Sequence, residues 1–511
     1  MQEQRKSLVM ISRTIRTIPL LICITVFCSS MTPLKKGGKN NIFISNYENV
    51  LGTSFELKVK AINSKQADLA EKAALQEITR LSEILSGYDK NSEFEHWMST
   101  HHQPVTISKE LMEVLSACET WSMKTNGALN PSAETINMLW KKAEARQELP
   151  TAKEINNAVA LATQQHWQLD LINGTAIHTS GAALKLNSFV KSYIIEKATK
   201  AALSIKDVSG IVMNIGGDIV VKGDMNELIK IANPISNAIN DPALTSVSLQ
   251  NKAIATSGNY RRGNRINGKW YSHIVDPRTG IPTEGIISAT VIADDGVEAG
   301  ALATAFNVLS VNESVKLASQ FEHTDYLIIT NKGEHIQSKG WSAFETASSP
   351  KSIVPTTQDK DWNTDYQVAV NVALAQQPGF AKRPFLAIWV ADAENKPIRT
   401  VTVWFNKQKW LRDLRSWFNA YNGNFTPESL DLGSVASATR MPGMYTINWD
   451  GKDDKGNYVK QGNYTINIEV AREHGTYQLM QQEVKCVKKA QSYTLQGNVE
   501  VTSATIDYKK K

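Results

Sequence analysis

The sequence has few cysteines and little net charge, and both scarcities narrow the classes of protein it can encode. It holds four cysteines in 511 residues, and two of them, Cys23 and Cys28, fall within the first thirty. Cys118 and Cys486 stand far apart with no Cys-x-x-Cys pair, so neither a disulfide scaffold nor a structural zinc site is predicted. Lys and Arg number 56 against 50 Asp and Glu, and a net charge of +6 over this length does not indicate a nucleic-acid protein.

The N-terminal segment has the pattern of an export signal. Basic residues precede an apolar run from Ile18 to Phe27, which is too short to span a bilayer. The small residues of Cys28-Ser29-Ser30 follow, so residues 1–30 are predicted to be a signal peptide. Cys28 could instead carry a lipid, although Phe27 is bulky for that processing. We expect an exported protein, and whether it is free or associated with the membrane stays open.

The rest of the chain divides into two regions with different patterns. Residues 43–341 mix helical periodicity at 64–86, after Ser108 and at 190–202 with strand-like runs at 55–59, 211–215 and 287–292, which indicates an α+β domain. Residues 342–365 are polar and contain prolines, and they are predicted to be a linker. Residues 366–511 hold short β-type runs separated by Gly-rich turns, which predicts an all-β sandwich.

Three short motifs in the first region could carry chemistry. Asn214-Ile215-Gly216-Gly217-Asp218 follows an apolar run, and its glycines let backbone N–H groups approach a phosphate or a flat ring. Thr256-Ser257-Gly258-Asn259-Tyr260 adds hydroxyls beside an aromatic ring. The segment 273–280, His-Ile-Val-Asp-Pro-Arg-Thr-Gly, places a histidine that can accept a proton beside a turn. Each motif alone is also compatible with an ordinary turn.

These motifs occur in order with four others. Leu-Gly-Thr-Ser-Phe stands at 51–55, Gly-Ala-Leu-Asn-Pro at 127–131, Leu-Lys-Leu-Asn-Ser-Phe-Val-Lys at 184–191 and Ala-Leu-Ala-Thr-Ala at 301–305. The series resembles the ApbE-like FAD:protein FMN transferases over about residues 45–341. The resemblance implies an ApbE-like α+β domain in a periplasmic enzyme that uses Mg²⁺ to split the pyrophosphate of FAD. It also implies transfer of FMN to a Thr or Ser of an exported acceptor protein, with release of AMP.

The resemblance assigns roles to individual residues of this chain. His273 would be the base that accepts the hydroxyl proton, and Lys191 would approach the phosphates. Ser188, through its backbone carbonyl, and Thr304 would bind the metal ion. The expected FAD contacts are Leu51, Tyr88, Ala128, Leu129, Asn130, Lys185, Lys191, Gly216, Gly217, Asp218, Ser257, Gly258 and Ile274.

At two positions the sequence departs from the family pattern. The family has an Asp four residues before the Thr that corresponds to Thr304, whereas this chain has Gly300, and Lys185 stands where the family has another Asp. Mg²⁺ prefers carboxylate ligands, so its binding is in doubt. Lys185 could supply charge in place of the metal, or Asp294, Asp295 or Glu298 could replace the missing ligand. Alternatively, the chain is a flavin-binding or partner-docking protein with impaired catalysis.

The second region carries its own resemblance. Trp-Asp-Gly at 449–451 and Gly-Asn-Tyr at 462–464 are similar to a periplasmic β-domain of unknown function that is fused to some ApbE-like proteins, and also to flagellar hook-cap sandwich modules. Acceptors of the family carry a segment like Ser/Thr-Gly-Ala-Thr. The chain has Ala-Ser-Ala-Thr at 436–439, so Thr439 is a candidate for self-modification with FMN, against the alternative of a plain loop.

Overall fold

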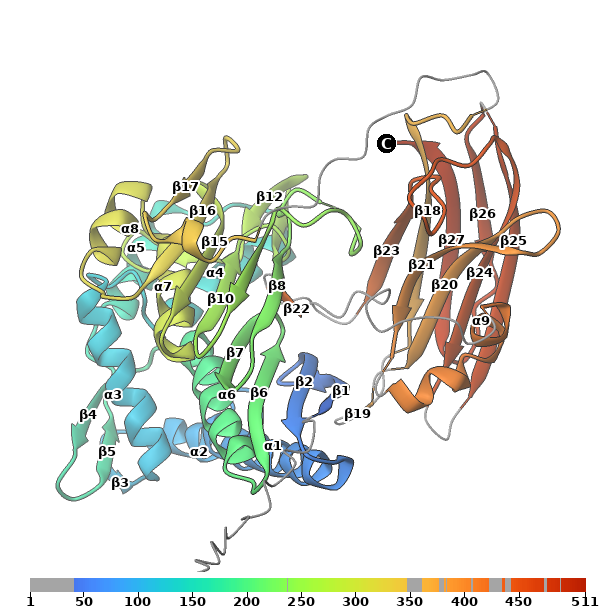
Figure 1. The fold of residues 1–511 in the computed structure, drawn as a ribbon. Coiled ribbons are helices and arrows are strands. Elements are labelled where there is room, and N and C mark those ends of the chain that lie inside the picture. The colour runs from blue at the N-terminus through green and yellow to red at the C-terminus, as the bar shows by residue number, and fades with distance from the viewer. Residues whose placement is uncertain are drawn as a thin grey trace, which may run out of the picture. The chain divides into compact units, whose positions relative to one another are not determined.

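The computed structural model describes residues 41–511 except 237, 347–360, 376–380, 383, 406–407, 422–433, 437–442, 473–475 and 488. The predicted signal peptide, Thr439 and most of the predicted linker therefore lie outside the described residues. Figure 1 shows the fold. In the part of the chain that is described, no helix has the length and apolar composition needed to cross a membrane.

The first domain mixes helices with one large sheet and several small ones. Its helices are α1 Ser64–Leu85, α2 Glu93–Ser99, α3 Lys109–Lys124, α4 Ala133–Arg146, α5 Ala152–Ala162, α6 Asn187–Leu203, α7 Gly296–Val308, α8 Val311–Ala318 and the 3-10 turn η1 Trp341–Ala343. The large sheet uses β1 Asn41–Val50, β2 Thr53–Ala61, β6 Val208–Ile215, β7 Asp218–Gly223, β10 Ala253–Gly258, β15 Ile286–Ala293, β16 Asp325–Thr330 and β17 His335–Gln337. The remaining strands are β3 Pro104–Thr106, β4 Trp167–Asp170, β5 Thr175–His178, β8 Glu227–Ile231, β9 Thr245–Leu249, β11 Gly263–Ile266, β12 Lys269–Ser272, β13 Val275–Asp276 and β14 Ile281–Pro282.

The large sheet is antiparallel and buried on both faces. Within this domain its strand order is β17-β16-β15-β10-β7-β6-β2-β1. In β6, Ile211 and Met213 belong to one apolar core, whereas Val212 between them belongs to another. Successive side chains of a strand point to opposite faces, so a strand covered on both sides needs a continuous apolar run. This is why Ile211, Val212 and Met213 are apolar in succession.

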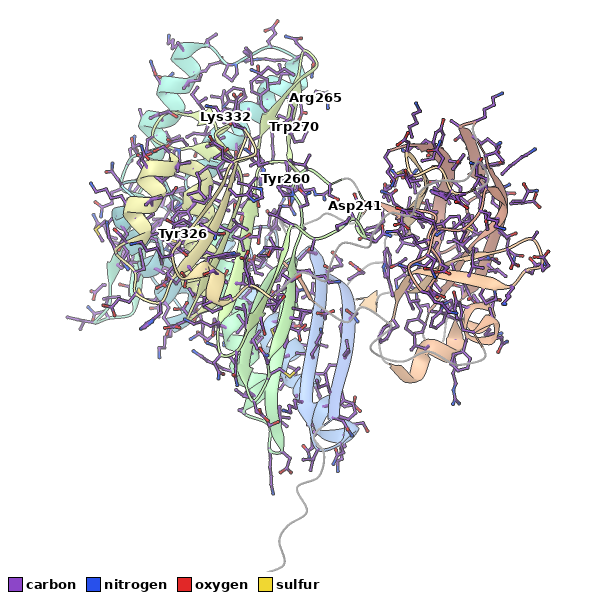
Figure 2. The ribbon with its side chains drawn as sticks, turned by 45° about the horizontal axis from the view of Figure 1, so that its top comes forward. Asp241, Tyr260, Arg265, Trp270, Tyr326 and Lys332 are labelled. Carbon is purple, nitrogen blue, oxygen red and sulfur yellow. The ribbon has the colours of Figure 1, made fainter. Side chains whose placement is uncertain are left out.

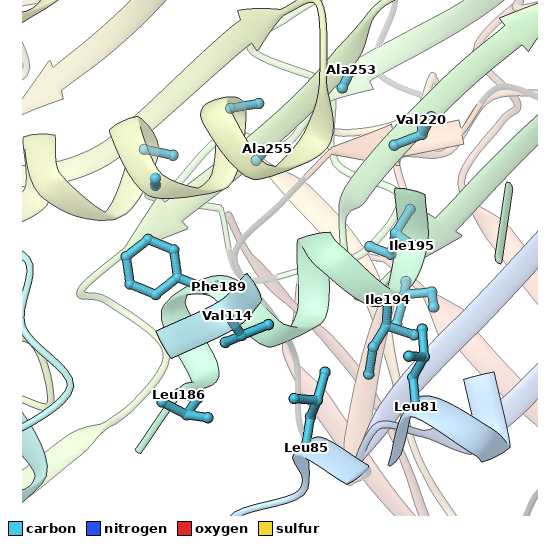
Figure 3. Packing of buried hydrophobic residues seen from close by; sticks show 14 of the residues in the cluster. Leu81, Leu85, Val114, Leu186, Phe189, Ile194, Ile195, Val220, Ala253 and Ala255 are labelled. Carbon is cyan, nitrogen blue, oxygen red and sulfur yellow. The ribbon is translucent and has the colours of Figure 1, made fainter. Parts of the chain in front are cut away.

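Helices α1, α3, α6 and α7 supply the core on one face of this sheet (Figure 3). The strands under α7 present small side chains, including Ala253 and Ala255, which are fully buried. Helix α7 is itself built from small residues such as Ala299, Gly300 and Ala303. Small side chains on both sides allow backbones to approach closely. Helix α7 therefore packs tightly on β10, β15 and α6.

A second apolar core covers the opposite face of the sheet. It joins Val221, Ile254 and Ile329 of the large sheet to Ile229 of β8, Val247 of β9 and the ring of Trp341. The domain thus has three layers, with helices on one face of the large sheet and the small sheet of β8 and β9 on the other. Because other elements cover the two faces of the large sheet, the ends of its strands are where loop residues or a ligand can approach it.

The C-terminal domain consists of two antiparallel sheets around a separate apolar core. One sheet has the order β23-β18-β27-β26 and the other β21-β20-β24-β25. Trp362 and Trp449 are fully buried in that core. The elements are β18 Tyr366–Leu374, β19 Ala381–Lys382, β20 Phe385–Ala391, β21 Pro397–Trp404, η2 Gln408–Asp413, α9 Arg415–Ala420, β22 Ser434–Ala436, β23 Met444–Trp449, β24 Gly462–Ala471, β25 Tyr477–Cys486, β26 Gln491–Leu495 and β27 Val501–Lys510.

The predicted fold class is confirmed for both domains. Helix α1 begins after Asn63, whose side chain accepts from the backbone of Gln66, and α3 begins after Ser108, which caps it in the same way. The predicted third helix is α6, which starts three residues earlier than its apolar periodicity, at Asn187. The two sheets of the second domain match the predicted β-sandwich.

Candidate functional site

Two tight hairpin turns lie side by side at one end of the large sheet. Gly216 and Gly217 connect β6 to β7 with φ angles of 59° and 93°, and Leu51 and Gly52 connect β1 to β2 with φ angles of 50° and 73°. Positive φ at both central residues is the pattern of a two-residue turn that matches the twist of a hairpin. The N–H of Gly216 donates to the Ser54 carbonyl at 2.9 Å, which holds the two turns together.

Helix α6 brings a lysine to this end of the sheet. Lys191 Nζ lies 2.7 Å from a carboxylate oxygen of Asp218, the first residue after the glycine turn. Asp218 is buried, and burial raises the pKa of its carboxyl even though Lys191 and the Thr256 backbone act in the opposite direction. The predicted residues Lys191, Gly216, Gly217 and Asp218 therefore stand together.

A second group gathers around the ring of Tyr88, in the loop between α1 and α2. Lys185 Nζ lies 3.8 Å from the centre of this ring and donates a hydrogen bond to the Gly87 carbonyl. The Asn187 side chain donates to the Tyr88 hydroxyl at 2.7 Å. Tyr88 is 75% exposed, so its other face is open to a flat ligand. Asn187 and Lys191 are four residues apart on α6, so one helix face joins the two groups.

Arg262 adds a positive charge that is only partly compensated. Its Nε atom is buried and has no hydrogen-bond partner among the described residues. Burial lowers the pKa of this guanidinium, and Tyr88 acts in the opposite direction. A buried N–H group without a hydrogen-bond partner is costly, so a ligand that accepts from it would be bound more tightly.

His273 is held in one tautomer by the backbone of Arg262. Its Nδ1 lies 3.0 Å from the Arg262 carbonyl. A carbonyl can only accept, so Nδ1 carries the proton and Nε2 presents a lone pair. Burial lowers the pKa of His273 to about 4, and the charge of Arg262 contributes to this shift. The imidazole is therefore neutral near pH 7 and able to accept a proton.

Strand β10 ends at the same end of the sheet. The Ser257 carbonyl accepts from the Asn307 side chain at 2.9 Å. A Cβ at Gly258 would lie 2.5 Å from the ring of Tyr260, so only glycine lets this ring pack against the strand. Figure 2 shows Tyr260 just beyond β10. Ile274 donates its N–H to the Ser272 hydroxyl next to His273.

The loop after α3 lies beside Lys185. The Pro131 carbonyl accepts from the Lys185 N–H at 3.0 Å. Ala128 and Leu129 are buried in the core. The side chain of Asn130 bonds to the Ala162 carbonyl and to Ser132, so its amide is used within the loop.

The predicted metal ligands occupy the contact between α6 and α7. The Thr304 hydroxyl donates to the Gly300 carbonyl of its own helix at 3.0 Å. Ser188 is in the first turn of α6, where helix geometry directs its carbonyl to the N–H four residues later. Gly300 faces Ser192, whose hydroxyl lies where a side chain at position 300 would begin.

Three residues of this neighbourhood were not predicted from the sequence: Asn187, Ser192 and Arg262. Arg261 and Arg262 directly follow the Thr-Ser-Gly-Asn-Tyr motif, so the pair of arginines was a readable signal. Asn187 and Ser192 flank the predicted Lys191 but gain their significance only from contacts to other segments.

Both domains match known families. Residues 51–328 match the ApbE family. Residues 365–503 match a family described as a predicted periplasmic protein of unknown function.

Relatives named as FAD:protein FMN transferases share the first domain. An FAD:protein FMN transferase of Klebsiella pneumoniae is 26% identical over 237 residues, which are 46% of this chain and 73% of that protein. The corresponding enzyme of Haemophilus influenzae is 26% identical over 340 residues, 61% of this chain and 94% of that protein. The crystal structure of the ApbE protein from Thermotoga maritima has 25% identity and a TM-score of 0.53, and the alignment covers 60% of this chain and 100% of that one.

Proposed function

Because this chain belongs to the ApbE family, we propose that it is an exported FAD:protein FMN transferase. The observation that carries the proposal is the pairing of Arg262, a cation without a hydrogen-bond partner at Nε, with His273, a neutral imidazole fixed by the Arg262 carbonyl. A phosphoryl transfer needs positive charge for the phosphates and a base for the incoming hydroxyl. Export is supported by the second domain, whose family is described as periplasmic.

The proposed reaction joins FMN to a protein hydroxyl. The hydroxyl oxygen of a Thr or Ser in the acceptor attacks the phosphorus of the FMN half of FAD. The bond between this phosphorus and the bridging oxygen breaks, and AMP leaves with the bridging oxygen. The hydroxyl proton passes to Nε2 of His273, which the tautomer leaves unprotonated.

The other predicted residues would hold FAD in place. Tyr88 presents an exposed ring for the flavin, with Leu51, Ala128, Leu129, Asn130 and Ile274 proposed as further contacts. Lys185 and Lys191 supply charge near the phosphates. One side of the proposed FAD site would be formed by the turn of Gly216, Gly217 and Asp218 and by the strand end at Ser257 and Gly258.

The experiment combines purified protein, FAD and an exported acceptor with a Ser/Thr-Gly-Ala-Thr segment. AMP release and a gain of FMN mass on the acceptor are the expected results. His273→Asn keeps a donor for the Arg262 carbonyl but removes the base, and it should slow transfer by about 10²- to 10⁴-fold. AMP release without acceptor modification would identify a hydrolase, and neither product would reject the proposal.

The specific observation in favour of a second candidate is Gly300. Without a carboxylate there, the chain could bind FAD and dock a partner without cleaving the cofactor. FAD binding without AMP release, at any Mg²⁺ concentration and with acceptor present, would support this candidate over the transferase.

Self-modification at Thr439 remains a separate proposal about the second domain. Intact-mass measurement after incubation with FAD tests it directly. A mass gain of one FMN that disappears in Thr439→Ala is the expected result, and an unchanged mass would remove Thr439 as an acceptor.

A further inference from the structure

The family implies Mg²⁺, but the described residues do not fit this ion. Mg²⁺ needs several hard oxygen ligands, commonly including one or two carboxylates. Position 300 has no side chain, so the Thr304 hydroxyl, which donates its proton to the Gly300 carbonyl and keeps its lone pairs, has no carboxylate one helical turn before it. Asp218, the carboxylate nearest to these groups in the predicted set, pairs with Lys191 at 2.7 Å. Among the described residues, no group of three or more His, Cys, Asp or Glu could hold a metal ion.

The carboxylates that could have replaced the missing ligand are engaged elsewhere. Asp294 pairs with Lys252 at 2.6 Å. Asp295 caps α7 by accepting from the backbone N–H groups of residues 297 and 298. Glu298 accepts from the Thr324 hydroxyl at 2.6 Å. Each of these carboxylates therefore already accepts a hydrogen bond through one of its two oxygens.

The packing of α6 against α7 also fills the space beside position 300, where the family pattern has an Asp. A Cβ built at Gly300 would lie 2.3 Å from Ser192 Oγ and 3.3 Å from Ser192 Cβ. The close contact of α6 and α7 occupies the space in which a carboxylate stem would start. Gly300 therefore belongs to a close contact between α6 and α7, and it also lacks the side chain that would bind a metal ion.

Two basic residues, Lys185 and Arg262, can supply the positive charge that a metal ion would otherwise provide. Lys185 stands over the Tyr88 ring, and the buried Nε of Arg262 has no hydrogen-bond partner among the described residues. Lys185 bonds to a carbonyl and not to a carboxylate, and none of the described carboxylates forms an ion pair with Arg262. Two cations without a carboxylate partner, one of them over an exposed aromatic ring, suit an aromatic ligand with a diphosphate.

We propose that Lys185 and Arg262 bind the diphosphate of FAD as fixed charges, so that FAD binding needs no divalent cation. The inference rests on the proposed function and adds the way in which the same site holds its substrate. Arg262 contributes planar N–H donors and Lys185 an ammonium group, and together they neutralise two negative charges. A metal ion would otherwise supply this neutralisation.

Calorimetric titration of the full chain with FAD, in EDTA and in Mg²⁺, tests the proposal. We expect dissociation constants within about twofold of each other in the two conditions. Lys185→Met and Arg262→Met should each weaken binding by about tenfold or more, the worth of a charge-assisted hydrogen bond. Lys90→Met in the exposed loop after Tyr88 and Arg265→Met in β11 are matched controls that should change binding by less than about twofold.

Riboflavin serves as the second probe because it has the same ring system without phosphates. If Lys185 and Arg262 contact phosphate, their variants should weaken FAD binding but leave riboflavin binding unchanged, whereas equal losses for both ligands would overturn the proposal. FAD binding that EDTA lowers by about tenfold or more would also overturn it while leaving the transferase proposal standing. No FAD binding in either condition would overturn both proposals.

Discussion

At the scale of single residues, Gly300 is the position where this chain departs most clearly from the family pattern. Replacing a glycine inside a helix by alanine normally stabilises the helix by about 0.5–1 kcal/mol. Here the new Cβ would meet Ser192 Oγ at 2.3 Å. We therefore predict that Gly300→Ala lowers the free energy of unfolding by about 1–3 kcal/mol. Denaturant unfolding monitored by circular dichroism measures this change.

A double-mutant cycle isolates the cause of that loss. Ser192→Gly removes the side chain that Gly300→Ala would strike, so in this background the alanine should be neutral or stabilising. Gly181→Ala is a control for glycine replacement in general, since a Cβ there would meet nothing within 4 Å. Additive effects of the Gly300 and Ser192 changes would show that the helix contact is not the reason for the glycine.

The sequence correctly placed site residues side by side only where a single motif contains the residues that lie together. Gly216, Gly217 and Asp218 are contiguous, so their turn was readable. Arg262 depends on distant segments, because its significance comes from burial and from Tyr88, which is far away in the sequence. The pair of arginines was readable in the sequence, but the buried Nε of Arg262 without a partner could be found only in the structure.

At the scale of elements, the turn between β6 and β7 sets the position of Asp218 for Lys191. Gly217 has a φ of 93°, which a residue with a Cβ reaches only with strain. We predict that Gly217→Ala costs about 1–2 kcal/mol of stability and also weakens FAD binding, because the turn would shift Asp218 and with it Lys191. Thermal unfolding and FAD titration measure the two effects, with Gly181→Ala as the control. Lost stability with unchanged FAD binding would separate the turn from the site.

Element boundaries followed from the sequence wherever caps and periodicity agreed. Helix α1 has its cap at Asn63 and an apolar stripe that includes Leu81 and Leu85 (Figure 3). Helix α6 was predicted to begin at Val190 but begins at Asn187, and its N-cap residue, Leu186, makes no side-chain capping bond. The first turn of α6 has no capping signal, and its start could not be placed by pattern alone.

At the scale of the whole molecule, the two domains differ in their histidines. Every histidine of the chain except His474 belongs to the first domain, and His474 lies outside the described residues. His166, His178 and His273 are held in buried settings that lower their pKa. Acid should therefore destabilise the first domain through histidines that the described part of the second domain lacks.

The sign of this effect follows from proton binding. A histidine with a lowered pKa binds fewer protons in the folded state, so its contribution to stability is complete above the unfolded pKa near 6.5 and is lost as the pH falls toward the folded value. For His273 that value is about 4. Burial raises the pKa of the carboxyls of Asp218 and Glu119, so these two groups act in the opposite direction as the pH falls toward their ordinary range.

We predict that lowering the pH from about 7 to about 5 reduces the free energy of unfolding of the first domain by about 1–2 kcal/mol through His273 alone. Calorimetric unfolding of wild type and His273→Asn at both values measures this share, since the variant lacks the titrating ring and should lose less stability. His335→Asn, at an exposed position of β17, should show the same loss as wild type. An identical loss in His273→Asn would mean that this imidazole is not held neutral by its surroundings, and its proposed role as the resting base would fail with it.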